Sequence, residues 1–322
     1  MDGANGVSVI PHRPRSRNSY RAWQHAGFRY SRDMSKIHIG ISGWRYPPWR
    51  GVFYPDGLAQ SRELEFASRE LPTIELNGSF YSLQRPSSYA AWYAATPPGF
   101  VFSHKGNRYL THNLRLGERI QPALANVMAS GVFELREKLG PFLWQLPPHF
   151  HFDADRLEHF FQLLPHDLRA AQALAQQHEP RMKGRVALEI DANHKLRHAL
   201  EIRHESFNDP AFVALLRKYK VALVVADTAG KWPDYEDITA DFMYLRLHGA
   251  EELYASGYDD AALDHWAARI RAWADGGQPK DARLISDKPP PRRASRDIYC
   301  YFDNDIKVRA PFDAKNLIAR LR

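Results

Sequence analysis

Eight short apolar runs, each ending in a polar or charged residue, constrain the fold of this chain more than any other feature. They occupy residues 37–44, 73–80, 100–105, 142–147, 198–204, 221–227, 242–248 and 298–305. Helix-length segments separate most of these runs, and the alternation predicts parallel strands joined by crossover helices. We therefore expect an α/β fold, a (β/α)8 TIM barrel with eight parallel strands, as a single domain over residues 34–322.

The helices of this barrel are expected between the runs and after the last one. Their predicted positions are 61–71, 86–95, 123–139, 153–163, 167–178, 210–219, 261–274 and 313–321. The segment 231–239 shows no convincing helical period, and residues 185–190 have the composition of a ninth strand. The run PPPRRASR at 289–296 predicts an extended, polyproline-type loop before the last strand.

The net charge of +7 is confined to two segments of the chain. Residues 1–33 carry six arginines and two aspartates, and residues 280–297 carry six basic residues and three aspartates, so these segments contribute +4 and +3. The expected barrel body is therefore electroneutral. This distribution argues against a broad surface that follows nucleic-acid phosphates, although the two basic segments keep nucleic-acid binding or processing as an alternative function.

Residues 1–33 show no sustained apolar period and predict a disordered basic extension. Two interpretations stay open, namely a flexible arm or a stretch that precedes a true translation start at Met34. No run reaches the roughly 20 apolar residues that a membrane span needs, and no export signal is evident. The single cysteine, Cys300, excludes an internal disulfide and is expected to be buried, so we predict a cytoplasmic protein without a membrane partner.

Polar strand ends indicate where chemistry is expected, because such barrels place their sites at the carboxyl ends of the strands. Alternate residues share a face of a strand, which pairs Glu75 with Asn77 and Glu201 with Arg203. The candidate catalytic residues, chosen for general acid–base chemistry, are Glu75, Glu201, Asp227 and His248. A structural ion-pair network remains an alternative for these charges, and Asp227 could instead cap the turn that follows it.

The remaining polar and aromatic residues at the strand ends are expected to bind the substrate. These candidates are Trp44, Tyr46, Asn77, Tyr81, Lys105, His112, Arg115, Gln145, Arg203, His204, Arg246, Tyr254, Asn304 and Asp305. The predicted ligand is a polar small molecule, sugar-like or phosphorylated, and the predicted reaction is that of a hydrolase, isomerase or lyase. A non-catalytic ligand-binding barrel is a further alternative.

No cofactor or metal is expected from the motifs of this chain. It contains neither a phosphate-binding P-loop nor a dinucleotide-binding glycine pattern. The histidine pairs at 194 and 198 and at 149 and 151 lack the context of a metal site, and we expect solvated surface roles for both.

Seven segments in one order resemble the domain-of-unknown-function 72 (DUF72, YecE-like) family. They are GISGWRYPPWRGVFYP at 40–55, ELNGSFY at 75–81, Lys105 with TH at 111–112 and RL at 115–116, LGPFLWQLPP at 139–148, EIRHESF at 201–207, RLHG at 246–249 and YFDND at 301–305. The resemblance implies a TIM barrel from about residue 37 to the end of the chain and implies no activity. The chain departs from this family in two places. Where the family commonly has Asn-Asn-Asp with a glycine shortly after, this chain has Asp at position 303 and no glycine shortly after residue 305. The segment around 289–296 is also longer.

Overall fold

The computed structural model describes residues 35–322, in which eight parallel strands close into a barrel in chain order. The strands are β1 (Ile37–Ser42), β2 (Thr73–Leu76), β3 (Val101–Lys105), β4 (Leu139–Gln145), β5 (His198–Glu201), β6 (Val221–Asp227), β7 (Phe242–Leu247) and β8 (Asp297–Phe302). Pairing of β1 with β8 completes the ring. The expected (β/α)8 barrel is confirmed, whereas the predicted disordered extension lies outside the described residues.

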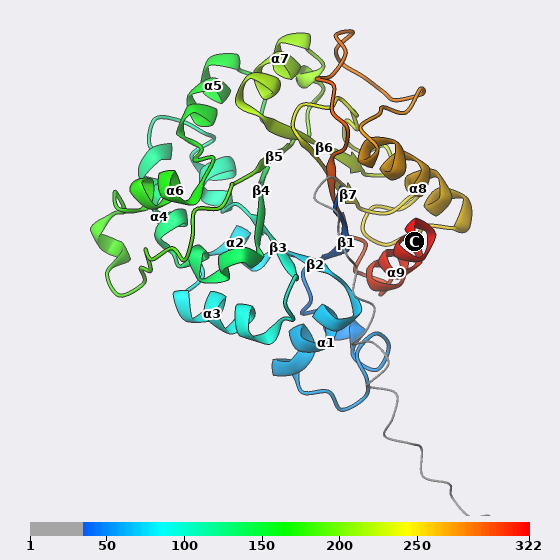
Figure 1. Ribbon diagram of the computed structural model, residues 1–322, viewed down its shortest axis with the longest axis horizontal. Helices are drawn as coiled ribbons and strands as arrows, with labels where there is room; N and C mark the ends of the chain where they lie inside the picture. The colour runs from blue at the N-terminus through cyan, green and yellow to red at the C-terminus, as the bar shows by residue number, and fades with distance from the viewer. Residues whose placement is uncertain (1–34) are drawn as a thin grey trace, which may run out of the picture. The chain divides into compact units, whose positions relative to one another are not determined.

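Helices surround the barrel as an outer ring (Figure 1). The α-helices are α1 (Glu63–Glu70), α2 (Gly78–Tyr81), α3 (Pro86–Ala95), α4 (Ile120–Ala129), α5 (Ala154–Leu163), α6 (Leu168–Ala175), α7 (Pro210–Tyr219), α8 (Asp260–Ala274) and α9 (Ala310–Leu321). Short 3-10 segments are η1 (Pro47–Trp49), η2 (Gln60–Arg62), η4 (Val132–Lys138), η5 (Pro180–Met182) and η6 (Glu205–Phe207), and η3 (Tyr109–Asn113) is a π-helical turn. No helix in residues 35–322 is long and apolar enough to cross a membrane.

Three local expectations meet different outcomes in the structure. The helix expected over 123–139 divides at Gly131, whose φ is 101°. A Cβ at that position would lie 2.5 Å from the Pro86 Cα, so the close approach of α3 requires glycine. Residues 185–190 form no strand, and only Ala187 makes an isolated bridge, to Ser130. The segment between β6 and β7 contains no helix, as its lack of period indicated.

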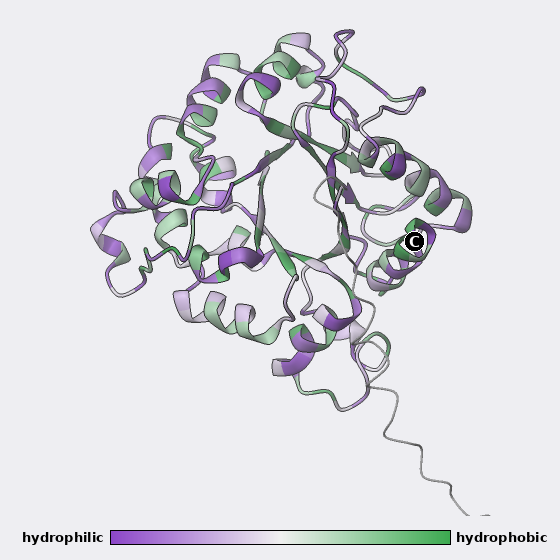
Figure 2. Cartoon of the chain, in the orientation of Figure 1, coloured by the Kyte–Doolittle hydropathy of each residue, from purple (hydrophilic) through white to green (hydrophobic). Residues whose placement is uncertain are grey.

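Alternate strand residues build two cores on either side of the barrel wall. Inside the barrel pack Leu143, Ala199, Ala222, Val224, Ala226, Phe242, Tyr244, Tyr299 and Tyr301. The other face packs against the helices, and Cys300 lies there fully buried, as expected. Figure 2 shows apolar strands inside and helices whose residues are partly polar.

Candidate functional site

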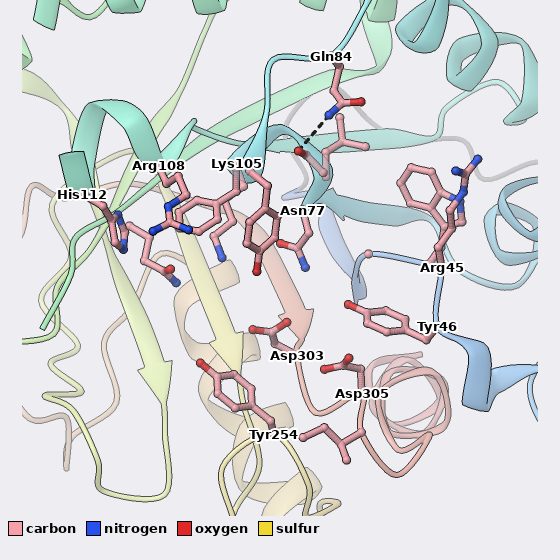
Figure 3. A pocket seen from close by; sticks show the side chains of 18 of the residues that line it. Arg45, Tyr46, Asn77, Gln84, Lys105, Arg108, His112, Tyr254, Asp303 and Asp305 are labelled. Atoms are coloured by element: carbon pink, nitrogen blue, oxygen red, sulfur yellow. Dashed lines mark hydrogen bonds between the residues drawn. The ribbon is translucent and has the colours of Figure 1, made fainter. Parts of the chain in front are cut away.

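A pocket of about 810 Å³ opens at the carboxyl ends of the barrel strands, and we call it the mouth pocket. Its lining residues are Gly43, Trp44, Arg45, Tyr46, Leu76, Asn77, Gly78, Phe80, Tyr81, Gln84, Trp92, Lys105, Arg108, His112, Gln145, Arg203, Tyr254, Asp303, Asp305 and Ile306. Figure 3 shows polar side chains from several loops converging on this space. Its volume lies within the range typical of small-molecule sites.

The loop after β1 forms one side of the mouth pocket through a tight turn. Gly43 has a φ of 78°, and a Cβ there would lie 2.8 Å from the Tyr46 hydroxyl oxygen. Tyr46 donates a hydrogen bond of 2.5 Å to the Ser42 carbonyl oxygen, and Asn77 Nδ2 donates one of 2.8 Å to Ser42 Oγ. These contacts fix two pocket-lining polar groups against the end of β1.

Arg246 is the centre of a buried charge cluster that also contains Glu75, Glu201, Asp303 and His248, and we call it the Arg246 network. Its guanidinium binds Glu75 in a bidentate manner, with Nε 3.1 Å from Oε2 and Nη2 2.9 Å from Oε1. Nη1 donates to Glu201 Oε2 at 2.9 Å, and Nη2 donates to Asp303 Oδ2 at 2.8 Å. Bidentate, charge-assisted bonds of this kind are the strong ones in proteins.

The two glutamates of the network receive further donors. Ser42 Oγ and the Tyr244 hydroxyl each donate to Glu75 at 2.6 Å. Gln145 Nε2 lies 2.9 Å from Glu201 Oε1, and Arg203 Nε lies 2.8 Å from the same oxygen. Burial acts to raise the pKa of Glu201, but the charges of Arg203 and Arg246 outweigh it and hold the pKa far below its usual range.

His248 completes the network as a neutral imidazole. Its Nε2 lies 3.2 Å from the Arg246 Nη1, which can only donate, so Nε2 is the acceptor and Nδ1 carries the proton. Nδ1 lies 3.0 Å from Asp303 Oδ2, so its proton is next to that carboxylate. Burial, followed by the charge of Arg246, lowers the pKa of His248, in agreement with a neutral ring.

The placement of these groups bears on the expected acid–base residues. Glu75, Glu201 and His248 are fully buried and do not line the mouth pocket. Gln145, Arg203 and Asp303 do line it and also bond to the network. The network therefore lies directly beneath the pocket floor, and its geometry favours the structural alternative for Glu75, Glu201 and His248.

Lys105, at the end of β3, differs from Arg246, the cation of the network. Its side chain is 7% exposed and lines the mouth pocket, with Nζ 4.5 Å from the centre of the Phe80 ring. Within residues 35–322 its Nζ has neither a hydrogen-bond acceptor nor an ion-pair partner. Burial, followed by the charge of Arg246, lowers the pKa of Lys105 to about 8.

Asp305 is the corresponding unpaired acid, on the loop after β8. It lines the mouth pocket and forms no ion pair with any residue that the structure describes. Burial, followed by the negative charge of Asp303, raises the pKa of Asp305 to about 6. Figure 3 shows Asp305 and Lys105 on different sides of the pocket, and we call these two residues the open pair.

Aromatic side chains form part of the rim, but they divide into two groups. Trp44, Tyr46, Phe80 and Tyr81 line the mouth pocket, and Tyr81 is 70% exposed. Trp49, Phe53 and Tyr54 pack against one another, and the Trp49 Nε1 donates to the Asp305 carbonyl oxygen at 3.1 Å. The second group therefore anchors the loops after β1 and β8, whereas the first offers faces to a ligand.

Four expected site residues lie neither in the mouth pocket nor in the Arg246 network. Asp227 accepts a hydrogen bond of 3.0 Å from Tyr258 on the outer side of the barrel, because Val225, two residues before it, faces the helices. Asn304 follows Phe302 on the outer face for the same reason and donates to Asp313. Asp227 and Asn304 thus each share a strand face with the residue two positions earlier, but that face points away from the barrel axis.

The other two residues lie on loops. His204 accepts the Ser206 backbone N–H at 3.1 Å as the cap of η6, and its ring lies 3.9 Å from that of His151. Arg115 is exposed and does not line the mouth pocket. Trp44, Tyr46, Asn77, Tyr81, Lys105, His112, Gln145, Arg203, Tyr254 and Asp305 do line it.

Three charged pocket residues were not among the expected ones, namely Arg45, Arg108 and Asp303. A signal for Asp303 exists in the pairing of the strands. Arg246 is in register with Tyr301, both point into the barrel, and Asp303 follows Tyr301 by two residues. Arg108 follows β3 in a loop, where no periodicity indicates the direction of a side chain.

The histidine pairs and the basic segment lie apart from the pocket. His198 is buried, which corrects its expected surface role: its Nδ1 accepts from Trp144 Nε1 at 3.2 Å, and its Nε2 lies 2.7 Å from the Pro165 carbonyl oxygen. Residues 280–297 precede β8 and so belong to the amino-terminal end of the barrel, opposite the pocket. Among them Arg296 is buried and bonds to the Gly277 and Pro291 carbonyl oxygens. Nucleic-acid binding by this segment stays a prediction.

The fold and the pocket together define the class of protein: a TIM barrel whose candidate small-molecule site lies at the carboxyl ends of its strands, over a buried ion network. Residues 38–322 match the family described as "Protein of unknown function DUF72". The chain therefore belongs to the DUF72 family.

Similarity to individual proteins is consistent with that family. The crystal structure of a DUF72 family protein from Thermotoga maritima MSB8 has a TM-score of 0.67 and 22% identity, covering 89% of this chain and 99% of that one. A DUF72 family protein from Enterococcus faecalis V583 has a TM-score of 0.60 and 16% identity, covering 88% and 95%. At these identities the likeness concerns the fold alone.

A curated sequence relative is the UPF0759 protein YunF of Bacillus subtilis (strain 168). It is 29% identical over 119 residues, which are 35% of this chain and 41% of that protein. The match thus covers about two fifths of the length of this relative.

Proposed function

We propose that the protein is an enzyme that binds a polar small molecule in the mouth pocket and exchanges a proton with it through Asp305. The observation that carries this proposal is an unpaired carboxyl in the pocket whose pKa is raised to about 6. A carboxyl group with a pKa near the ambient pH can both accept and release a proton efficiently. Hydrolases, isomerases and lyases all need such a transfer.

Two further features support catalysis over passive binding. Lys105 offers an unpaired positive charge on another side of the pocket, where it can stabilise negative charge that develops on a substrate. The Arg246 network holds Gln145, Arg203 and Asp303 rigidly at the pocket floor. Groups that are fixed in advance stabilise a transition state without reorganising during the reaction.

The test is turnover of a panel of sugars, sugar phosphates and polyhydroxy acids, followed by proton NMR with the wild-type protein and Asp305→Asn. We expect the wild type to convert at least one compound and the variant to convert it about 10²- to 10⁴-fold more slowly. Asp287→Asn is the matched control, because it removes the same charge from an exposed site at the other end of the barrel. Binding of a panel compound without conversion by the wild type would instead support a non-catalytic ligand-binding barrel.

The pH dependence of that turnover gives an independent check. If Asp305 acts as the base, kcat/KM rises as the pH passes about 6 and the carboxyl ionises. It falls again as the pH passes about 8 and Lys105 loses its charge. We therefore expect a bell-shaped curve whose acid limb disappears in Asp305→Asn. An acid limb that persists in that variant would exclude Asp305 as the titrating group.

We also propose a cytoplasmic location. The one cysteine of the chain, Cys300, is buried in the outer core, so the fold contains no internal disulfide. Proteins of oxidising compartments commonly depend on such bonds, whereas cytoplasmic ones do not.

A further inference from the structure

We propose that the substrate carries an oxyanion, a carboxylate or a phosphoryl group, which binds between Lys105 and Arg108 on one wall of the mouth pocket. This inference rests on the proposed function, because it names the chemistry of the molecule on which Asp305 acts. The hydroxylated part of the same molecule then lies against the opposite wall of the pocket.

The first support is the difference between two buried lysines. Lys138 is 4% exposed, and its Nζ donates to the Tyr93 and Thr96 carbonyl oxygens, both at 2.7 Å, and to Thr96 Oγ1 at 3.0 Å. Lys105 is 7% exposed, yet its three donors have no acceptor within residues 35–322. A buried ammonium without an acceptor is costly unless a ligand supplies one. The pocket in front of Lys105 has room for that ligand.

The second support is the surplus of positive charge around Lys105. Arg108 lines the same wall, is exposed, and forms no ion pair with any described residue. His112 lies next to Arg108 in Figure 3, and its pKa reflects the positive charge around it. Burial, followed by the charges of Arg108, Arg203 and Lys105, lowers the pKa of His112 to about 4. Of these cations Arg203 is committed to Glu201, so Lys105 and Arg108 are the pair available to an anion.

The opposite wall has groups that suit hydroxyls and repel an anion. Asp303 and Asp305 line it, together with the Tyr254 ring (Figure 3). Nearer to Lys105 in Figure 3, Asn77 Oδ1 is buried and has no hydrogen-bond donor among the described residues. TIM barrels often bind phosphate after strands seven and eight. Here the Gly249 backbone N–H after β7 already bonds to the Tyr258 hydroxyl, which leaves the wall after β3 for the anion.

The experiment is calorimetric titration of the full chain with three matched probes at pH 7 and moderate salt: D-glucose, D-gluconate and D-glucose 6-phosphate. We expect at least one anionic probe to bind at least tenfold more tightly than glucose. Lys105→Met should weaken that binding about ten- to hundredfold and so reduce the preference for the anionic probe over glucose, because it removes the charge and keeps an apolar stem. Lys105→Arg should restore most of the affinity.

Lys307→Met is the control, because Lys307 is exposed, pairs with Glu252 and does not line the mouth pocket. Equal losses in Lys105→Met and Lys307→Met would overturn the inference, since they would reflect net charge alone. Failure of the wild type to prefer either anionic probe over glucose would also overturn it. Tighter binding of the phosphate ester assigns a phosphoryl group, and tighter binding of gluconate assigns a carboxylate. Because binding and not turnover is measured, this test can fail while Asp305→Asn still slows catalysis.

Discussion

Two sets of charged side chains lie at the same end of this barrel, and they differ in whether their charges are satisfied. In the Arg246 network Glu75 and Glu201 each receive at least two donors, and Arg246 itself contacts three acids. In the open pair, Lys105 and Asp305 face the pocket without an ion-pair partner among the described residues. The charges of the first set are already satisfied, and within it Asp303 reaches the pocket, whereas both charges of the second set are available to a ligand.

This difference suggests how to separate structural charges from functional ones at a barrel mouth. A satisfied buried network holds strands together, and removing one member leaves the others unpaired. An unsatisfied charge in a pocket reduces stability and is therefore expected only where binding or catalysis uses it. Substitutions in the two sets should accordingly change stability in opposite directions.

The largest effect is expected for Arg246→Met. Loss of the guanidinium leaves Glu75, Glu201 and Asp303 buried without their shared cation, and we expect the free energy of unfolding at pH 7 to fall by about 3–5 kcal/mol. Urea unfolding monitored by tryptophan fluorescence measures this change. Glu201→Gln is a milder variant for comparison. It should lower the free energy of unfolding by only about 1–3 kcal/mol, because Arg246 keeps two other acids.

The stability that Arg246→Met loses should depend on pH, and the direction follows from the pKa shifts. The pKa values of Glu201 and Asp303 are lowered in the folded protein, by Arg246 among other groups, against the effect of burial. Acids with lowered pKa values stabilise the fold above their unfolded values of about 4 and lose that contribution as the pH falls. The deficit of the variant should therefore shrink below about pH 4. A deficit that is constant with pH would mean that packing, not charge, stabilises the barrel there.

A smaller effect of opposite sign is expected for Asp305→Asn. The raised pKa of Asp305 means that ionisation disfavours the folded state, an effect that appears above about pH 4 and is complete above about pH 6. Allowing for the partial exposure of the side chain, we expect the variant to be more stable by about 1 kcal/mol at pH 8 and equal to the wild type at pH 3.5. Denaturant midpoints at the two pH values measure the difference. If the variant were less stable than the wild type at pH 8, the Asp305 charge would be a stabilising one, like those of the Arg246 network.

The fold was predictable from the sequence because each strand run is apolar, short and followed by a polar end. The pairing of Glu201 with Arg203 was likewise predictable, since two residues on one face of a strand end meet. The direction of that face was not. Whether Asp303 or Asn304 points inward depends on the register between β7 and β8, which residue alternation within one strand leaves undetermined.

The division into closed and open charges was also beyond the sequence. It depends on which side chains from distant strands meet, as Glu75 of β2 and Arg246 of β7 do across the barrel. Composition shows that both types of charge are present, but only the three-dimensional arrangement shows that Arg246 binds the glutamates and leaves Lys105 unpaired. The depth of each group, which sets the direction of its pKa shift, follows from the same arrangement.

The smallest effect is expected for Asp227→Asn, which tests whether the open set extends to β6. Asp227 bonds to Tyr258 outside the mouth pocket, and asparagine retains its size and an acceptor oxygen. Burial raises the pKa of Asp227, so removing its charge should not weaken the fold, and we expect a stability change within about 0.5 kcal/mol at pH 7. Turnover of any compound converted by the wild type should stay within about twofold, well under 1 kcal/mol of barrier height. A tenfold loss of turnover at unchanged stability would show that the Asp227–Tyr258 contact positions the loop after β7. The charges that serve function would then include a residue that does not line the mouth pocket.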